Sequence, residues 1–225
     1  MKVRQLHRWD VTPREAREIQ EQLRARVVLH DTPGEIRTVA GADAAVDAVS
    51  GRIFAGVVVF RYPGLEELER AWVCQALRFP YVPGLLSFRE APALLAGIEK
   101  LKHRVDVLFC DGQGYAHPRR FGLACHLGLL LDCATIGCAK TLLVGTHRVP
   151  GRNAGSFAEL RDGEIIGAAV RTRPGVKPVY VSAGHRVSLE RAIELTLAVC
   201  DGTRIPKPTR EADGFVEAVK KGGRG

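Results

Sequence analysis

The stretch from residue 106 to residue 140 limits most strongly what this chain can fold into. It opens with the apolar run Val107–Cys110, which is typical of a buried, parallel strand. The run ends at Asp111, and Gly112 and Gly114 then let the backbone turn tightly and approach a ligand. Open α/β sheets carry their sites at the carboxyl ends of buried strands. Asp-Gly is also an ordinary strand-ending turn, and that alternative stays open.

Cationic side chains follow this acid closely, namely His117, Arg119 and Arg120. Beyond them, residues 121–131 are apolar nearly all round, which predicts a buried helix. An acid beside a cluster of cations, all on rigid elements, indicates a site for a metal ion and a phosphate.

The chain before this stretch predicts one helix and then three strands. Thr12 and Glu15 are spaced as a capping box, and the apolar stripe that follows predicts a helix over 13–29. Strand patterns then cover three ranges, 36–49, 52–60 and 69–77. Ser50-Gly51 is typical of a hairpin turn, so we expect an antiparallel meander.

Asp43 lies in the middle of the first of these strands, among the small residues Ala42, Ala44 and Ala45. A carboxylate in so apolar a setting is costly to bury without a partner. The small neighbours leave room for a partner above it. The alternative is an acid on a solvated strand face.

Residues 80–84 form a rigid loop that carries one aromatic side chain, Tyr81. Two prolines fix the backbone φ angle there and make the loop stiff. Tyr81 either projects from this loop or packs on the helix that follows. That helix opens at Ser87 with the pattern Ser-x-x-Glu, so the local sequence favours Glu90 as part of a capping box.

Residues 135–140 predict a short strand that ends at Lys140. This lysine would then lie near the same edge as Asp111, or it is simply solvated. Asp162-Gly163 is typical of a hairpin turn. Further strand patterns cover 156–160, 164–172 and 178–182.

Ser188 is expected to cap one more helix, which stops before Gly202. His185 precedes this cap and is either a turn residue or a neighbour of the site. The tail, residues 206–225, contains Asp213 and ends in cations among glycines, so its last residues are expected to be disordered.

The net charge of +8 favours anionic partners such as nucleic acid. The longest apolar run, residues 123–131, is too short to cross a bilayer, and the chain does not open with a charged and then apolar leader, so no membrane association is expected. The 6 cysteines lack paired CxxC spacing, which indicates reduced thiols and a cytoplasmic location.

Four blocks of this sequence resemble the endonuclease V family, whose members nick nucleic acid near deaminated adenine (hypoxanthine, or inosine). The central block is DGQGYAHPRRFGLACHLGLLLDCATIGCAK, at 111–140. The others are GADAAVD at 41–47, PYVPGLLSFRE at 80–90 and PTREAD at 208–213. The resemblance covers nearly the whole chain, and we expect a single domain over 1–225.

The order of the predicted elements favours an α/β fold with a mixed sheet and helices on both faces. Such a pattern fits an RNase H-like fold, which is the fold of the family. In that architecture the first strand lies beside the fourth, which brings Asp43 next to Asp111, and Glu90 can join them.

The resemblance implies roles for the matching residues. Glu90 matches the catalytic glutamate of the family, which reverses the preference for a cap. Lys140 matches an active-site lysine, and Asp213 matches a position that the family fills with histidine or aspartate. The positions expected to contact DNA are Tyr81 and Pro83 as a wedge, Gly112 and Gly114 at the base, and Arg89, His117 and Arg119 at phosphates.

Asp43, Asp111 and Glu90 are the expected metal ligands, because carboxylates at close range repel and a divalent cation relieves the repulsion. Hard oxygen ligands select Mg²⁺, with Mn²⁺ as a substitute, rather than zinc. One-metal and two-metal operation both stay open.

The resemblance implies a repair enzyme that nicks DNA at the second phosphodiester bond 3′ to deoxyinosine, with the base flipped into a pocket. We expect this enzyme to be a monomer. One alternative is an endoribonuclease acting on inosine in single-stranded RNA. A remote alternative is a module that binds hypoxanthine and does not cut.

Overall fold

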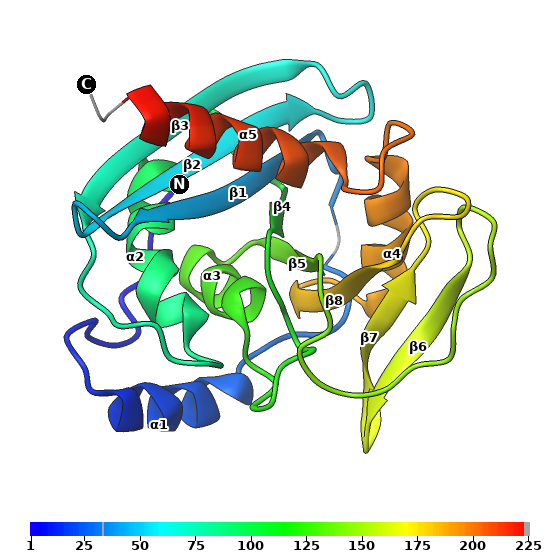
Figure 1. The fold of residues 1–225 in the computed structure, drawn as a ribbon, viewed down its shortest axis with the longest axis horizontal. Coiled ribbons are helices and arrows are strands. Elements are labelled where there is room, and N and C mark those ends of the chain that lie inside the picture. Colours follow the sequence, from blue (N-terminus) through cyan, green and yellow to red (C-terminus); the bar gives the residue numbers. More distant parts are fainter. Residues whose placement is uncertain (33, 223–225) are drawn as a thin grey trace.

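The computed structural model describes residues 1–32 and 34–222, which form an eight-stranded sheet with flanking helices (Figure 1). The strands are β1 Thr38–Asp47, β2 Arg52–Arg61, β3 Glu67–Ala76, β4 Val107–Cys110, β5 Ala134–Ala139, β6 Phe157–Asp162, β7 Glu164–Val170 and β8 Val179–His185. Their order in the sheet is β3-β2-β1-β4-β5-β8-β7-β6. The pairs β1–β4 and β4–β5 are parallel, and the other neighbouring pairs are antiparallel. The predicted mixed sheet is confirmed.

Helices cover both faces of this sheet, as predicted. They are α1 Pro13–Arg24, α2 Leu86–Glu99, α3 Leu123–Leu131, α4 Leu189–Ala198 and α5 Lys207–Gly222. On one face, Leu94 of α2 and Leu127 of α3 share a buried cluster with Val57 of β2. On the other face, Leu195 of α4 shares a cluster with Val58 of β2. Because both faces are covered, β2 is buried at every position except its two ends.

The first helix begins as the sequence predicts and ends earlier. Thr12 and Glu15 form the complete capping box, but α1 stops at Arg24 instead of continuing to residue 29. The backbone of Val28 is held outside the helix, because its N–H donates to His185 Nδ1 and its carbonyl accepts from the N–H of Arg186. These tertiary hydrogen bonds outweigh the apolar helical pattern.

His185 does not lie at the predicted site. It is the last residue of β8 and pairs with Thr135 at the start of β5. Lys140 follows the other end of β5, so the two side chains lie at opposite edges of the sheet. Of the two interpretations left open for His185, the structure therefore contradicts that of a neighbour of the site.

A helix that the sequence patterns did not predict, α5, occupies most of the C-terminal tail. Gly214 lowers the intrinsic helix propensity of this segment. Packing compensates, because Ala212 and Val216 are fully buried and Val216 shares a cluster with Phe54 of β2. The last residues, for which disorder was predicted, include 223–225 and lie outside the described residues.

In the part of the chain that the structure describes, no helix has the length and apolar character needed to span a membrane.

Candidate active site

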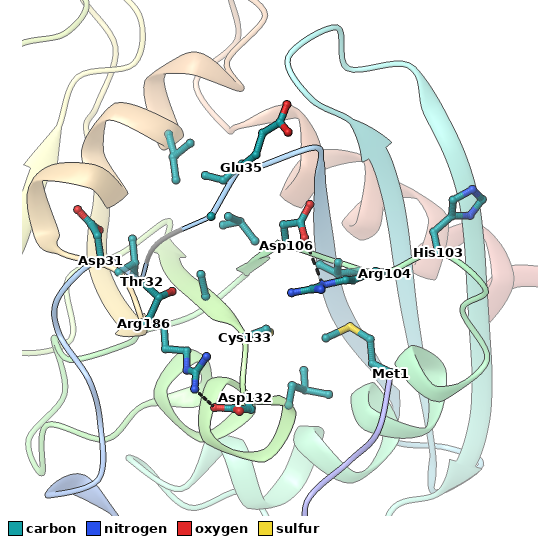
Figure 2. Close-up of a pocket in the computed structure, with 18 of the residues that line it drawn as sticks. Met1, Asp31, Thr32, Glu35, His103, Arg104, Asp106, Asp132, Cys133 and Arg186 are labelled. Atoms are coloured by element: carbon teal, nitrogen blue, oxygen red, sulfur yellow. Dashed lines mark ion pairs between the residues drawn. The ribbon is translucent and has the colours of Figure 1, made fainter.

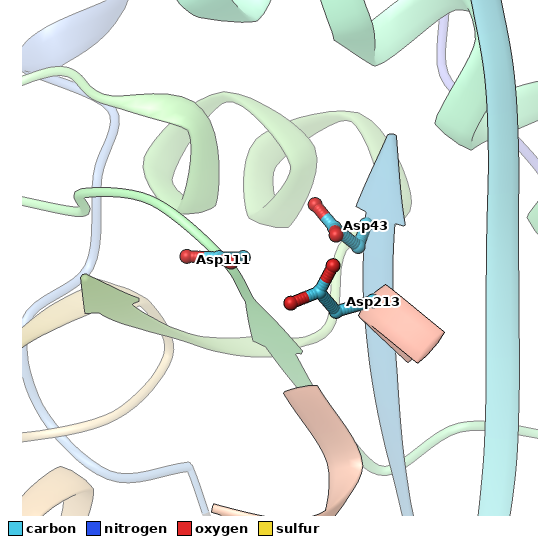
Figure 3. Close-up of side chains that lie close together, drawn as sticks. All are labelled: Asp43, Asp111 and Asp213. Atoms are coloured by element: carbon cyan, nitrogen blue, oxygen red, sulfur yellow. The ribbon is translucent and has the colours of Figure 1, made fainter. Parts of the chain in front are cut away.

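Three carboxylates meet at the edge of the sheet where the parallel strands end. Asp43 projects from β1, Asp111 follows β4, and Asp213 reaches in from α5 (Figure 3). One oxygen from each side chain lies within 4.8 Å of the others. The structure therefore brings together two predicted metal ligands and adds Asp213 to them.

The sheet register and one glycine place these acids. Ala42 pairs with Cys110 in the parallel register, which puts Asp43 beside Asp111. Gly41 lets α5 approach β1, because a Cβ at this position would lie 1.8 Å from the carbonyl oxygen of Pro208. No side chain fits there, and this close contact sets the height of Asp213 above the strand.

Glu90 lies inside α2 and does not cap it. The helix begins at Leu86 with Leu85 as its N-cap, and no side chain caps it. Ser87 instead contacts His126, with 3.0 Å between Oγ and Nδ1. The capping-box interpretation of Glu90 is wrong, because the helix starts earlier than the sequence pattern indicates.

Glu90 lies close enough to the acid cluster to sense its charge. Burial, followed by the charges of Asp43 and Asp111, raises the pKa of Glu90 from 4.5 to about 8. Burial and the charge of Asp111 raise the pKa of Asp43 from 3.8 to about 7. Glu90 is not among the three acids that lie within 4.8 Å of one another. The site thus concentrates more negative charge than it can hold ionised without a cation.

Lys140 supplies one positive charge to this cluster. Its Nζ lies 2.7 Å from Asp111 Oδ2 and 2.9 Å from Asp213 Oδ2. Burial lowers the pKa of Lys140, but the hydrogen bonds to Asp111 and Asp213 outweigh it and raise the pKa above its usual range. The prediction that Lys140 lies at the same edge as Asp111 is confirmed.

A cavity of about 480 Å³ opens beside Asp111 and Lys140. Its lining includes Tyr81, Pro83 and Gly112, which were predicted to contact DNA. Gly114 is not part of this lining, and its N–H donates to Ser182 Oγ at 2.9 Å. A Cβ at Gly114 would lie 2.3 Å from the carbonyl oxygen of Ala183, so this glycine serves packing against β8.

The loop that carries Tyr81 is fixed through the carbonyl oxygen of Gly84. This oxygen accepts hydrogen bonds from Gln20 Nε2 at 3.1 Å, from His117 Nε2 at 3.0 Å and from Arg119 Nη2 at 2.7 Å. His117 Nδ1 accepts from the N–H of Arg119, which assigns the proton to Nε2. Burial lowers the pKa of His117 to about 4 and keeps the ring neutral.

Gln20 is a residue of this site that the sequence patterns missed. It is 1% exposed and also donates to the carbonyl oxygen of Phe121 at 3.0 Å, so it ties the loop at Gly84 to the segment that precedes α3. The available signal was a polar residue on the apolar face of the first helix, one turn after Ala16.

Tyr81 projects into solvent from the fixed loop. Tyr81 is 71% exposed, so its ring is not buried against the helix that follows. The guanidinium of Arg89 lies 5.7 Å from the centre of the ring. Arg89, on α2, thus lies beside the ring of Tyr81, which lines the cavity.

A larger hollow of about 800 Å³ lies at the opposite edge of the sheet, where β4 and β5 begin (Figure 2). Its charged residues are largely paired. Arg186 Nη2 lies 2.7 Å from Asp132, and Arg104 Nε lies 3.4 Å from Asp106. This hollow therefore lacks the concentrated charge of the acid cluster.

A mixed sheet of this order, with carboxylates and a lysine at the carboxyl edge of its parallel strands, defines an RNase H-like nuclease. The family model for Endonuclease V matches residues 21–214. The chain belongs to the endonuclease V family, as the sequence motifs predicted.

Three relatives illustrate this membership. Endonuclease V from Roseiflexus sp. (strain RS-1) is 52% identical over 208 residues, which cover 92% of this chain and 93% of the relative. The crystal structure of Endonuclease V from Streptomyces avermitilis has a TM-score of 0.92 and 42% identity, with 100% of both chains covered. Ciona intestinalis Endonuclease V was solved in complex with a 24mer DNA containing an inosine followed by a ribo-adenosine. It has a TM-score of 0.82 and 28% identity, covering 92% of this chain and 97% of that one.

Proposed function

We propose that this protein repairs deaminated adenine by nicking DNA at the second phosphodiester bond 3′ to deoxyinosine, with a divalent cation as cofactor. One observation carries the proposal, namely that the acid cluster and the 480 Å³ cavity share Asp111. A base held in the cavity therefore lies next to the carboxylates. The inosine-containing DNA bound by the Ciona relative supports inosine as that base.

The carboxylates fit a hard divalent cation. Oxygens of Asp43, Asp111 and Asp213 lie within 4.8 Å of one another, and the raised pKa of Asp43 reflects the charge that a cation would neutralise. An all-oxygen donor set favours Mg²⁺ or Mn²⁺ over zinc. We propose that Asp43 and Asp111 hold the cation and that Glu90 and Asp213 complete the site. When bound, such an ion polarises a phosphodiester and lowers the pKa of water.

Lys140 balances the carboxylates and is positioned to donate a hydrogen bond to a phosphate oxygen. Its contacts with Asp111 and Asp213 hold its ammonium group at the cavity mouth. Glu90, with a pKa of about 8, is able to carry a proton at neutral pH. We infer that Glu90 is an acid–base group or a further ligand, in agreement with its match to the catalytic glutamate.

Tyr81 would act as the wedge that occupies the space left by the displaced base. Its exposure and the three hydrogen bonds to Gly84 support this role, because an exposed ring on a fixed loop enters a base stack at little entropic cost. His117 and Arg119 were expected at phosphates. Because both bind Gly84, we propose that they act by positioning the loop, and that Arg89 is the phosphate contact.

A nicking assay tests the proposal. Wild type should cut an inosine duplex only with Mg²⁺ or Mn²⁺ and should leave the inosine-free duplex intact. The nicking rate of Asp111→Asn should fall by far more than tenfold, where tenfold corresponds to about 1.4 kcal/mol of barrier. The variant should still bind the inosine duplex. Cleavage within tenfold of wild type would remove Asp111 from the reaction.

An inosine-specific endoribonuclease is the second candidate, because the DNA bound by the Ciona relative carries a ribo-adenosine after the inosine. Parallel digestion of matched DNA and single-stranded RNA distinguishes the two. We further propose that residues 1–225 act as one domain and as a monomer, in the cytoplasm. The 6 free cysteines support a reducing compartment.

A further inference from the structure

Two segments at one end of the sheet are strongly basic. Residues 150–157 and 171–178 contain no Asp or Glu. They adjoin the ends of three strands, since Phe157 of β6 pairs with Val170 of β7, which pairs with Val179 of β8 (Figure 1). We call the exposed cations on these segments the basic platform: Arg152, Arg173 and Lys177. Among the described residues, none of the three forms an ion pair.

A buried arginine joins the two segments. Arg171 is 7% exposed, and its guanidinium donates to the carbonyl oxygens of Gly151 at 2.8 Å, Pro150 at 2.9 Å and Val176. Within the described chain, its hydrogen-bond partners are all neutral carbonyls. A buried cation without a carboxylate leaves net positive charge in the surface above it, which favours a bound anion.

The basic platform lies at the same edge of the sheet as the acid cluster. Ala139 at the end of β5 pairs with Tyr180 near the start of β8. Arg204 bridges the two sites, because its guanidinium donates to the carbonyl oxygens of Lys140 at 2.8 Å and Lys177 at 2.9 Å. Neighbouring strands lie about 4.8 Å apart, so the strand ends that carry the platform lie about 5 to about 14 Å from β5 across the sheet. These distances correspond to about two to four nucleotide steps, at about 3.4 Å each along one strand.

We propose that the basic platform binds phosphates of the DNA strand a few nucleotides from the bond that is cut. The inference rests on the proposed function, because the strand must occupy the acid cluster for its neighbouring phosphates to reach the platform. Such contacts hold the register of the strand and carry no sequence information. They add affinity for inosine-containing and inosine-free duplexes alike.

The test compares two triple variants by the salt dependence of binding to an inosine duplex without Mg²⁺. The platform variant carries Arg152→Gln, Arg173→Gln and Lys177→Gln. Each duplex phosphate contact contributes about 0.9 to the magnitude of the slope of log affinity against log salt, so the slope of this variant should be smaller by about 2.7. When the salt rises from 50 to 200 mM, the affinity of wild type should therefore fall by a factor about 40 times larger than that of the variant.

The control variant carries Lys2→Gln, Arg26→Gln and Lys102→Gln, which removes the same charge from exposed positions away from the platform. Its slope should equal that of wild type. Equal slopes in all three proteins, or equal losses in both variants, would overturn the platform.

The salt dependence of binding to an inosine-free duplex tests the platform even if wild type does not nick inosine DNA. Failure of the proposed function and failure of this inference are thus separate results.

Discussion

Gly41→Ala tests whether the contact between α5 and β1 controls the acid cluster. The new Cβ would lie 1.8 Å from the carbonyl oxygen of Pro208 and 2.9 Å from the N of Thr209. Ordinary contacts begin at 3.4 Å, so the helix backbone must retreat by about 1.6 Å. Asp213 lies on the same helix and would retreat with it.

The expected loss follows from that displacement. A 1 Å misplacement at a reacting site can cost about 100-fold, so the nicking rate of Gly41→Ala should fall at least that far. Overpacking of this kind costs about 1–3 kcal/mol, which lowers the Tm by about 2–12 °C. Single-turnover nicking of an inosine duplex and calorimetry measure the two effects.

Gly214→Ala is the matched control on the same helix. A Cβ there meets no atom within 4 Å, and alanine is more stable than glycine inside a helix by about 0.5–1 kcal/mol. This variant should gain about 1–4 °C in Tm and nick at the wild-type rate. A Gly41→Ala protein with the Tm and nicking rate of wild type would refute the reasoning.

Four further outcomes are expected. Glu90→Gln should fold with a Tm no lower than that of wild type and lose most nicking activity, whereas full activity would return Glu90 to a purely structural role. Tyr81→Ala should reduce the nicking rate on duplex substrate by about tenfold or more, because stacking is worth about 1–3 kcal/mol per base. The loss on single-stranded substrate should be smaller, and Tyr81→Trp should restore the rate. Gln20→Leu should likewise lose more nicking activity on duplex than on single-stranded substrate, and its Tm should be lower. Gln22→Leu, on the exposed face of α1, should behave as wild type. In metal-free protein, the folded-state pKa values of Asp43 and Glu90 are raised to about 7 and about 8. Protonation of these two carboxyls therefore stabilises the folded protein, fully below about pH 4, and this stabilisation is lost as the pH rises through 7 to 8. The metal-free Tm should therefore fall from about pH 5 to about pH 9, and Mg²⁺ should raise it more at pH 9 than at pH 5; a Tm independent of pH would contradict these shifts.

Local sequence patterns were sufficient to predict the elements whose structure depends mainly on their own residues. The apolar run Val107–Cys110 predicts a buried strand ending at Asp111, and the hairpin at Ser50-Gly51 orders the strands before it. The parallel pairing that follows from this topology brings Asp43 beside Asp111, and it was expected from the order of elements. The central motif also identified the family.

Contacts between distant segments decided the rest. The sequence around Asp213 contains Gly214 and has weak helical propensity, and only packing on β1 and β2 turns it into α5. Glu90 matches a capping box by spacing, yet α2 starts earlier and buries it beside Asp43.

The loop anchor at Gly84 likewise joins residues from three separate parts of the chain. Gln20, on the first helix, meets His117 and Arg119 only in the folded protein. Spacing along the chain cannot reveal such a site, because burial and hydrogen-bond geometry are properties of the assembled fold.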